Sequence, residues 1–401
     1  MKSKKLFVTV FALSALLGVT SCGNGGDPEK NKVEFQFWCS FGQSVQEGVN
    51  SMITQFCEKV KAEEGVELSI SLDYQGGYDD IYDKISQGLG TGNIPTLAVA
   101  YPDHVAQYIA NETKQGQFVV DLTKFINDSK IGLGKEKYLG DINGSTAYGA
   151  DDIVETFFEE GKQYSVAGTY SMPFMKSSEA LFYNFDAVKR AMKAGYKPEI
   201  ADSDVLIKNY MSDISWDELV NFSRWILNNH TKVVNNLKSV IFYDSDSNLF
   251  ISRMFQEEIP YSSQVDGHGH IDFKTGDNRI AAEGVVDSIA NLAKETIDID
   301  PSTGTKATLL TTKTIYGQYG SNMFSAEECI FSIGSTGGAG YNEPKTDVFT
   351  VEVAKVPEVN DNPLYVTQGP TLTILNNPSL SKEQNERKQS KKYSWKTYLL
   401  W

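Results

Sequence analysis

Hydrophobic and polar positions follow two different periods along the N-terminal part of the chain. Residues 33–40 are rich in aromatic and β-branched side chains and residues 66–74 alternate, so both segments predict strands. Apolar side chains recur at helical spacing in 45–62 and 78–89, which predicts two helices. The short apolar run 96–101 is typical of a parallel strand buried on both faces. This order of strands and helices predicts right-handed crossovers in a layered α/β fold.

A second region of mixed strands and helices begins near Leu181. Apolar runs and helical spacing predict further elements at 181–184, 187–194, 216–227, 240–243 and 280–293. Ser215 is expected to cap the helix that begins at Trp216, and Glu218 at the third helical position completes a capping box. The chain has no internal repeat and no low-complexity linker between the two regions. We therefore expect two lobes joined by crossing strands.

The first residues have the pattern of an export signal. Lysines are followed by the apolar run 6–19, whose helix would span about 21 Å, short of the ~30 Å hydrocarbon core of a bilayer. The string Val19–Cys22 resembles the bacterial lipobox, in which the cysteine thiol takes a diacylglycerol. We predict a signal peptide over 1–22, lipidation at Cys22 and a flexible tether over 23–32. An ordinary signal peptide with a chance cysteine is the alternative.

Charge and composition narrow the classes of partner. The 401 residues carry a formal net charge of −15 at pH 7. An acidic body argues against nucleic acid, because phosphate neutralisation needs clustered Lys and Arg. The same balance disfavours a bulk anionic ligand. No other stretch approaches the ~18 apolar residues of a membrane span, so we expect contact with the membrane through the lipid alone. We also expect a monomer.

Cysteine and histidine do not predict a disulfide framework or a metal site. Cys39, Cys57 and Cys329 remain after lipidation, an odd number without a CxxC motif. His268 and His270 are the two histidines that lie close together in the sequence. We interpret this segment as a glycine-rich polar turn, with surface metal binding as the alternative. We predict no metal and no cofactor.

Short motifs along the chain resemble one protein family. They occur in the family's order, as Phe37-Trp38, Tyr74–Tyr78, Gly92–Pro95, Tyr101–Asp103, Ser171–Phe174 with Ser177, Leu181–Asn184, Ser215–Leu219, Phe324–Ser335 and Gln368–Thr371. Over residues 33–376 the chain is similar to family 1 extracellular solute-binding proteins of ABC importers. That family includes the maltose-, multiple-sugar- and glycerol-phosphate-binding proteins, and the glycerol-phosphate and oligosaccharide type is the most similar subgroup.

The resemblance implies the α/β two-lobe periplasmic-binding-protein type II fold, in which crossing strands join the lobes around a cleft. Lobe one would comprise 33–145 and 364–401, and lobe two would comprise 146–363. Family members run on through further helices that cover one lobe, so we expect those C-terminal helices to be missing here. The apolar ending, which includes Trp395 and Trp401, is expected to come from a truncated or frame-shifted reading of the gene.

Ligands of open α/β sheets bind beyond the carboxyl ends of strands. In lobe one that rule selects Trp38, Tyr78, Tyr101 and Asp103. Aromatic faces stack on the C–H-rich faces of sugars, while carboxylates and hydroxyls bond the sugar hydroxyls. For Trp38, a place in the core is as well supported as contact with a ligand. Tyr78 follows two glycines that let its loop approach a ligand closely.

The resemblance also implies ligand-binding roles for Tyr78, Ser177, Ser335 and Gly369, with Thr336 as the alternative to Ser335. Asp244 and Ser245 are added from their place after a second-lobe strand. The glycine-rich segment 334–340 lacks the GxxxxGK[ST] pattern, so we interpret it as a ligand contact and not a nucleotide site.

The predicted function is reversible binding, without catalysis. No nucleophile–base constellation is present in the sequence, and no catalytic residue is predicted. We expect a protein anchored on the extracytoplasmic face of the cell membrane. It would deliver a carbohydrate, an oligosaccharide or a glycerol-phosphate-like solute, to the permease subunits of an ABC importer. The alternative is a surface glycan-binding or glycan-hydrolysing lipoprotein.

Overall fold

The chain is described by a computed structural model that covers residues 32–89, 91–111, 116–134, 149–265, 268–344, 346, 348–376 and 388–398. The predicted signal peptide, the lipidation site Cys22 and the predicted tether up to residue 31 lie outside these residues. Within the described part, no helix combines the length and the apolar character that crossing a membrane requires.

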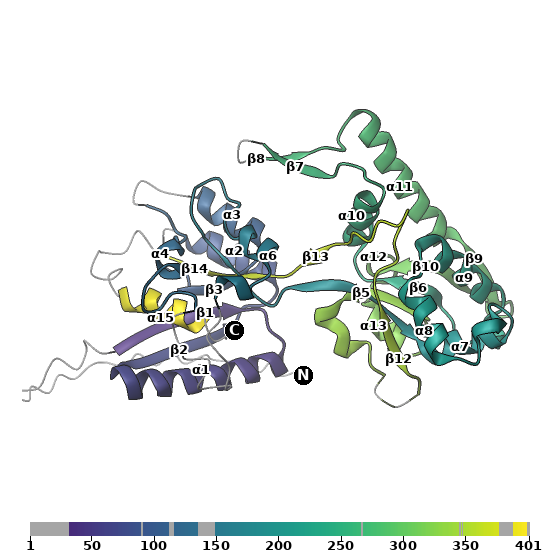
Figure 1. Ribbon diagram of the computed structural model, residues 1–401, viewed down its shortest axis with the longest axis horizontal. Coiled ribbons are helices and arrows are strands. Elements are labelled where there is room, and N and C mark those ends of the chain that lie inside the picture. Colours follow the sequence, from purple (N-terminus) through teal and green to yellow (C-terminus); the bar gives the residue numbers. More distant parts are fainter. Residues whose placement is uncertain are drawn as a thin grey trace, which may run out of the picture.

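The first lobe is built on a five-stranded sheet in the order β2-β1-β3-β14-β4 (Figure 1). Its strands are β1 Lys32–Cys39, β2 Glu67–Tyr74, β3 Leu97–Ala100, β4 Met172–Pro173 and β14 Thr371–Ile374. Its helices are α1 Gln43–Glu64, α2 Tyr78–Gly88, α3 Pro102–Ala110, α4 Thr123–Ile126, η2 Ala150–Asp152, α6 Glu155–Glu160 and α15 Lys388–Tyr398. β1, β2 and β3 are parallel, whereas β14 runs antiparallel to β3 and β4.

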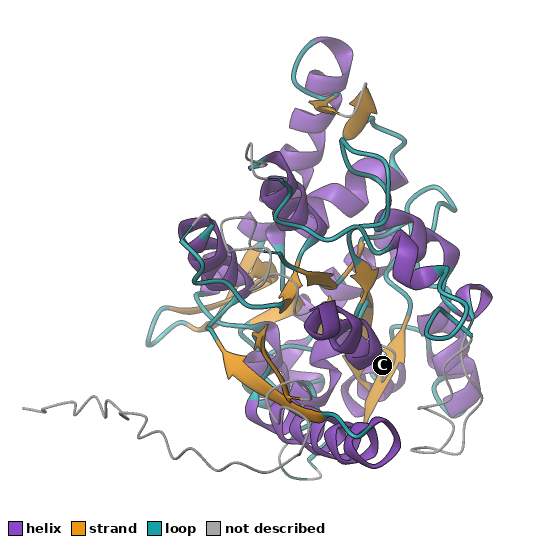
Figure 2. Ribbon diagram, turned by 90° about the vertical axis from the view of Figure 1, so that its left-hand side faces the viewer, coloured by secondary structure: helices purple, strands orange, loops and turns teal. Residues whose placement is uncertain are grey.

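Side-chain alternation explains why both faces of this sheet are covered (Figure 2). Phe35 and Phe37 of β1 point into one apolar cluster, and Trp38 points into the cluster on the other face. On α1 the buried residues Val49, Ile53, Phe56 and Val60 recur at helical spacing, so this helix packs a single stripe against the sheet.

The second lobe is built on a larger mixed sheet in the order β12-β5-β11-β6-β10-β9, with β13 paired to β5. The strands of this lobe are β5 Ser177–Asn184, β6 Ser239–Tyr243, β9 Thr296–Asp300, β10 Thr305–Thr312, β11 Phe331–Ser335, β12 Val351–Ala354 and β13 Thr367–Gln368. A separate hairpin consists of β7 Ser262–Val265 and β8 His268–Ile271. The helices are α7 Phe185–Lys193, η3 Pro198–Ile200, α8 Asp204–Ser212, α9 Trp216–Asn228, η4 His230–Lys232, α10 Asp246–Gln256, α11 Gly276–Lys294, α12 Lys313–Tyr316, α13 Gly320–Ser325 and η5 Thr336–Tyr341.

Two segments cross between the lobes, and both are visible in Figure 1 as the connections that carry β5 and β13. The chain leaves the first sheet after Pro173 and joins the second at Ser177. It returns between Gln368 and Thr371. The Phe174 N–H donates to the Pro370 carbonyl over 3.1 Å, which ties the two crossings together. These changes of sheet come later than the predicted lobe limits at 145/146 and 363/364.

Local signals in the sequence correspond to the observed elements. The five N-terminal elements occur where the periodicity predicts them, within about three residues at each end. The capping box of α9 is confirmed, since the Glu218 N–H donates to Ser215 Oγ over 3.2 Å and the Glu218 carboxylate accepts from the Ser215 N–H.

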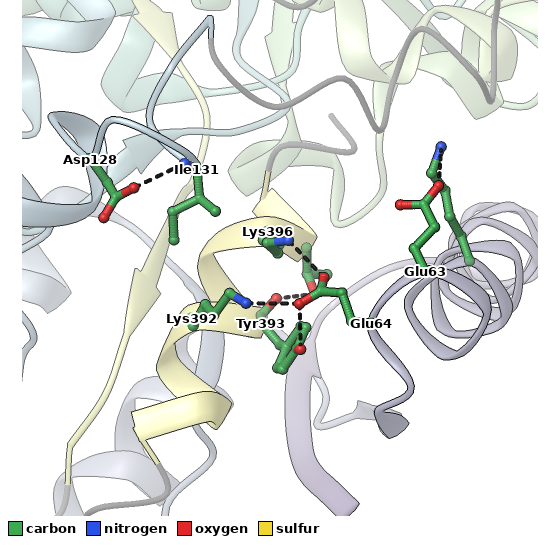
Figure 3. Close-up of polar contacts among 9 residues, drawn as sticks. Glu63, Glu64, Asp128, Ile131, Lys392, Tyr393 and Lys396 are labelled. Atoms are coloured by element: carbon green, nitrogen blue, oxygen red, sulfur yellow. Dashed lines mark hydrogen bonds and ion pairs between the residues drawn. The ribbon is translucent and has the colours of Figure 1, made fainter. Parts of the chain in front are cut away.

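The helix α15 was not predicted, and it is an integral part of the first lobe. Trp395 is fully buried and its Nε1 donates to the Ile131 carbonyl over 2.7 Å. Glu64, the last residue of α1, accepts from the ammonium groups of Lys392 and Lys396, each over 2.8 Å, and from the Tyr393 hydroxyl (Figure 3). The lobe therefore covers Tyr393 and Trp395 of α15, and the charges of Lys392 and Lys396 are paired with Glu64.

Candidate functional site

Three first-lobe residues selected from the sequence lie where strands end and helices begin. Tyr78 opens α2, Tyr101 is the N-cap of α3, and Asp103 is exposed in the first turn of α3. The Tyr78 and Tyr101 rings meet edge to face with centroids 4.8 Å apart, and both side chains are half-buried. Burial raises the pKa of Tyr101, with Tyr78 and nearby carboxylates adding to the effect. This corner of the lobe thus presents two aromatic rings and one carboxylate.

Trp38 lies in the core of the first lobe. It is 7 % exposed and packs with Ile81 of α2 and Tyr108 of α3. Its indole Nε1 has no hydrogen-bond partner among the described residues. The ring is thus enclosed by the sheet and two helices.

The second lobe contains a pocket of about 560 Å³ beyond the carboxyl ends of three neighbouring strands. These strands are β6, β10 and β11, of which β10 and β11 are both parallel to β6. Parallel strands end at the same edge, so the side chains that follow them converge there. The pocket is lined by Glu179, Asp244, Ser245, Asp246, Ser247, Asn248, Lys313, Thr314, Gly317, Tyr319, Ser335 and Gln368.

Asp244 follows β6, and its carboxylate lies close to the backbone of Gly320 and of Gly334. Its Oδ1 accepts from the Gly320 N–H over 2.6 Å. A Cβ at Gly334 would lie 2.5 Å from Asp244 Oδ2, so only glycine leaves room for the carboxylate there. Burial raises the pKa of Asp244, while the Gly320 hydrogen bond and the charge of Lys313 partly oppose the shift.

A buried hydrogen-bond network joins the pocket to both crossing strands. Glu179 of β5 accepts from the Tyr243 hydroxyl and, over 3.0 Å, from Asn248 Nδ2. The same Asn248 amide reaches Gln368 Oε1 of β13 at 3.5 Å. Burial raises the pKa of Glu179, against the lowering effect of these two donors. The lining residues are therefore coupled to the segments that connect the lobes.

Ser335 and Ser177 lie at the ends of adjoining strands. The Ser335 hydroxyl donates to Ser177 Oγ over 3.0 Å and accepts from the Gly337 N–H over 3.1 Å. The glycine-rich segment that follows forms η5, with Ser335 as its N-cap. These contacts fix the edge of the pocket next to β5.

Gly369 adjoins the pocket residue Gln368. Its φ is +133°, a conformation that other residues rarely adopt, and its carbonyl accepts from Lys176 Nζ over 2.9 Å. Lys176 also pairs with Glu160 of α6. Gly369 therefore helps hold the two crossing segments against each other.

The structure brings Asp244, Ser245 and Ser335 together around one pocket, with Ser177 bonded to it and Gly369 beside it. Tyr78, Tyr101 and Asp103 belong to α2 and α3 on the other lobe (Figure 1). Sequence reasoning missed other lining residues, namely Glu179, Asp246, Ser247, Asn248, Lys313, Thr314, Gly317, Tyr319 and Gln368. Asp246 could have been predicted, because it belongs to the Asp-Ser-Asp-Ser string that follows the same strand as Asp244.

Tyr319 is the aromatic side chain among the described lining residues. It is 55 % exposed, and Lys313 Nζ lies 3.7 Å from its ring centroid. A pocket with a partly exposed tyrosine ring and several carboxylate, amide and hydroxyl groups is suited to a hydroxylated ring. Within the described residues, no group of three or more His, Cys, Asp and Glu side chains is arranged to hold a metal ion.

Comparison with known proteins gives a family and a fold. A family model described as bacterial extracellular solute-binding protein matches residues 55–388. No curated protein matches the chain by sequence.

Solved structures similar to this chain include three solute-binding proteins. UgpB of Mycobacterium tuberculosis, in complex with glycerophosphocholine, has a TM-score of 0.59 and 17% identity, covering 91% of this chain and 73% of that one. The cyclic α-maltosyl-1,6-maltose binding protein of Arthrobacter globiformis has a TM-score of 0.56 and 15% identity, with coverages of 92% and 75%. The galacto-N-biose/lacto-N-biose I-binding protein of Bifidobacterium longum has a TM-score of 0.56 and 13% identity, also with 92% and 75%. The two-lobe periplasmic-binding-protein fold predicted from the sequence is confirmed.

Proposed function

We propose that this chain, which belongs to the family of bacterial extracellular solute-binding proteins, binds a carbohydrate between its lobes and delivers it to the permease subunits of an ABC importer. Its role would be binding without catalysis. Cys22 would carry the lipid that holds it on the outer face of the cell membrane.

The observation that carries the proposal is the second-lobe pocket beyond β6, β10 and β11. Its lining combines the exposed aromatic side chain of Tyr319 with carboxylate, amide and hydroxyl groups, which is the chemistry that binds a polyol. Solved structures with the same fold hold lacto-N-biose and glycerophosphocholine. The sequence identity to these proteins is too low to transfer their ligands to this chain. The choice between a sugar and a glycerol phosphate must therefore be argued from the side chains that line the pocket.

The second half of the site would come from the first lobe. Tyr78 and Tyr101 would close over the solute when the lobes rotate about the crossings at 174–177 and 368–371. Closure places ligand contacts on both lobes, and a permease can then distinguish the loaded protein from the empty one.

A thermal-shift panel of mono- and oligosaccharides and glycerol phosphates tests the proposal. A sugar that raises the melting temperature in proportion to the logarithm of its concentration, and is recovered unchanged, supports a binding protein. Release of product from the same sugar identifies the hydrolase alternative. No stabilisation by any member of the panel would remove the carbohydrate proposal.

The lipid anchor is tested separately in cells. Wild-type protein should incorporate radiolabelled palmitate and fractionate with membranes, and Cys22→Ala should do neither. Equal labelling of the Cys22→Ala protein would show that the cysteine is not the attachment site. Cys57→Ala serves as the matched control, since it removes a different cysteine.

A further inference from the structure

The pocket in the second lobe has an uneven balance of charge. Its lining includes the carboxyl groups of Glu179, Asp244 and Asp246 but, among the described lining residues, a single cationic side chain, that of Lys313. A solute that enters therefore meets more negative than positive groups at short range. The consequence depends on which of the three carboxylates is available to it.

Two of the carboxylates have donors from the chain itself. Both oxygens of Glu179 accept hydrogen bonds, from Tyr243 and Asn248. Asp246 accepts from the Thr314 hydroxyl over 2.5 Å. Their hydrogen-bonding capacity is largely used within the protein.

Asp244 differs from these two. Its Oδ1 accepts from the Gly320 N–H, but no donor to its Oδ2 is found among the described residues. One side of Oδ2 packs against the Gly334 backbone, in the space that a Cβ there would need, and Asp244 lines the pocket. A half-buried carboxylate with one unfilled oxygen at a pocket wall is a site for a donor from outside the chain.

Lys313 does not form an ion pair with Asp244. No carboxylate in the described part of the chain lies within 4.0 Å of its ammonium, which lies over the Tyr319 ring instead. The ammonium of Lys313 therefore does not occupy the hydrogen-bonding position at Asp244 Oδ2.

We infer that Asp244 is the specificity-determining residue of the second lobe, and that it selects an amine-bearing sugar over its neutral counterpart and rejects a sugar phosphate. The inference rests on the proposed function and deepens it. A protonated amine supplies both a donor to Oδ2 and a compensating charge, a hydroxyl supplies only the donor, and a phosphate brings a second anion next to carboxylates.

The test uses matched sugars that differ in one substituent. Glucose, galactose and mannose are each compared with their 2-amino and 6-phosphate forms by isothermal titration calorimetry at pH 7, with glycerol 3-phosphate included. For whichever skeleton binds, we expect the amine to bind about tenfold more tightly than the neutral sugar and the phosphate at least about tenfold more weakly. A phosphate that binds as tightly as the amine overturns the inference and leaves carbohydrate binding intact. If no member of any set binds, the inference fails, while the oligosaccharides of the thermal-shift panel still decide the proposed function.

The variant Asp244→Asn assigns the selectivity to this residue. Asparagine keeps an acceptor for the Gly320 N–H and the shape of the side chain but puts an NH2 group in the place of Oδ2, so affinity for the amine-bearing sugar should fall more than affinity for the neutral sugar. The amine-to-phosphate ratio should fall by about tenfold or more. Asp287→Asn, which removes an equal charge from the exposed face of α11, should leave the ratio unchanged. An equal fall in both variants would show that net charge, and not Asp244, sets the preference.

Discussion

Glu179 is 3 % exposed, although glutamates are rarely enclosed in this way unless they are paired. It is held by neutral donors, Tyr243 and Asn248, and not by a cation. Burial therefore raises its pKa above the ordinary value of 4.5, with the neighbouring Asp244 adding to the effect. The folded protein binds this proton more tightly than the unfolded chain does.

This difference predicts a pH dependence of stability. Between 4.5 and the higher folded-state pKa the folded state binds more protons, so the contribution of Glu179 to stability falls as pH rises through that window. Glu179→Gln removes the titration. The free energy of unfolding of the variant relative to wild type should therefore rise with pH, measured by urea unfolding between about pH 4 and 8. Glu283→Gln, exposed on α11, is the control, and a pH-independent difference at Glu179 would contradict the prediction.

Tyr78 offers a test of the first-lobe half of the site. It is half-buried, and its ring contacts Tyr101 at the start of α2. Tyr78→Ala should abolish the thermal shift produced by the bound sugar and lower the melting temperature of the free protein by only a few degrees. Tyr341→Ala, at a tyrosine that is 75 % exposed and does not line the pocket, should retain the full shift. Failure of Tyr78→Ala to fold would make Tyr78 a core residue.

The sequence predicted some of the pocket lining for a physical reason. Asp244 follows an apolar strand, and the end of such a strand can be recognised from local pattern, whereas Ser335 was implied by the family resemblance. Glu179 could not be found in this way, because the apolar run predicts the strand only from Leu181 onward. Gln368 lies on a two-residue strand that exists only through its pairing with β5. Such residues are defined by tertiary contacts.

At the scale of elements, Glu64 ties α15 to the end of α1. The side chain of Lys396 is 4% exposed, and its ammonium pairs with Glu64 over 2.8 Å (Figure 3). Removal of that carboxylate would take an ion-pair partner from a nearly enclosed cation, which is costly. No local sequence pattern connects these two residues, which lie at opposite ends of the chain.

We predict that Glu64→Gln lowers the free energy of unfolding by about 2 kcal/mol, since Glu64 is partly open to solvent and the full penalty of a buried pair is not reached. Its neighbour Glu63 provides the control. Glu63 is 51 % exposed and pairs loosely with Lys59 at 3.6 Å, so Glu63→Gln should cost less than about 0.5 kcal/mol. Urea unfolding of both variants measures the difference. Equal effects would show that α15 does not depend on this contact.

The elements that the sequence did predict share one property. The strands and helices over 32–100 and the capped helix α9 follow from periodicity and capping within a few neighbouring residues. The placement of β14 between β3 and β4 does not, because it depends on pairing between segments that are far apart in sequence. Local signals therefore predicted the α/β layers. The positions at which the chain crosses between the lobes could be seen only in the structure.

At the scale of the whole molecule, the crossings depend on Gly369. An alanine there would have the rare φ of +133° and would place its Cβ 2.7 Å from the Lys176 Cα. We predict that Gly369→Ala costs about 2–3 kcal/mol. Gly195 also has a positive φ, +117°, but a Cβ at that residue would have no other atom within 4 Å, so Gly195→Ala should cost only about 1 kcal/mol. Denaturant unfolding compares the two, and equal losses would mean that the close approach at Gly369 is unimportant.

The interleaving of β14 into the first sheet has a consequence for biosynthesis. Residues 177–368 form one uninterrupted stretch and hold every strand of the second sheet. The first sheet instead places a late strand, Thr371–Ile374, between two early ones. Because ribosomes deliver the polypeptide from its N-terminus, β1, β2 and β3 emerge first but must wait, with an unpaired edge at β3, until Thr371–Ile374 has also been made. We expect the middle of the chain to finish folding before its beginning does.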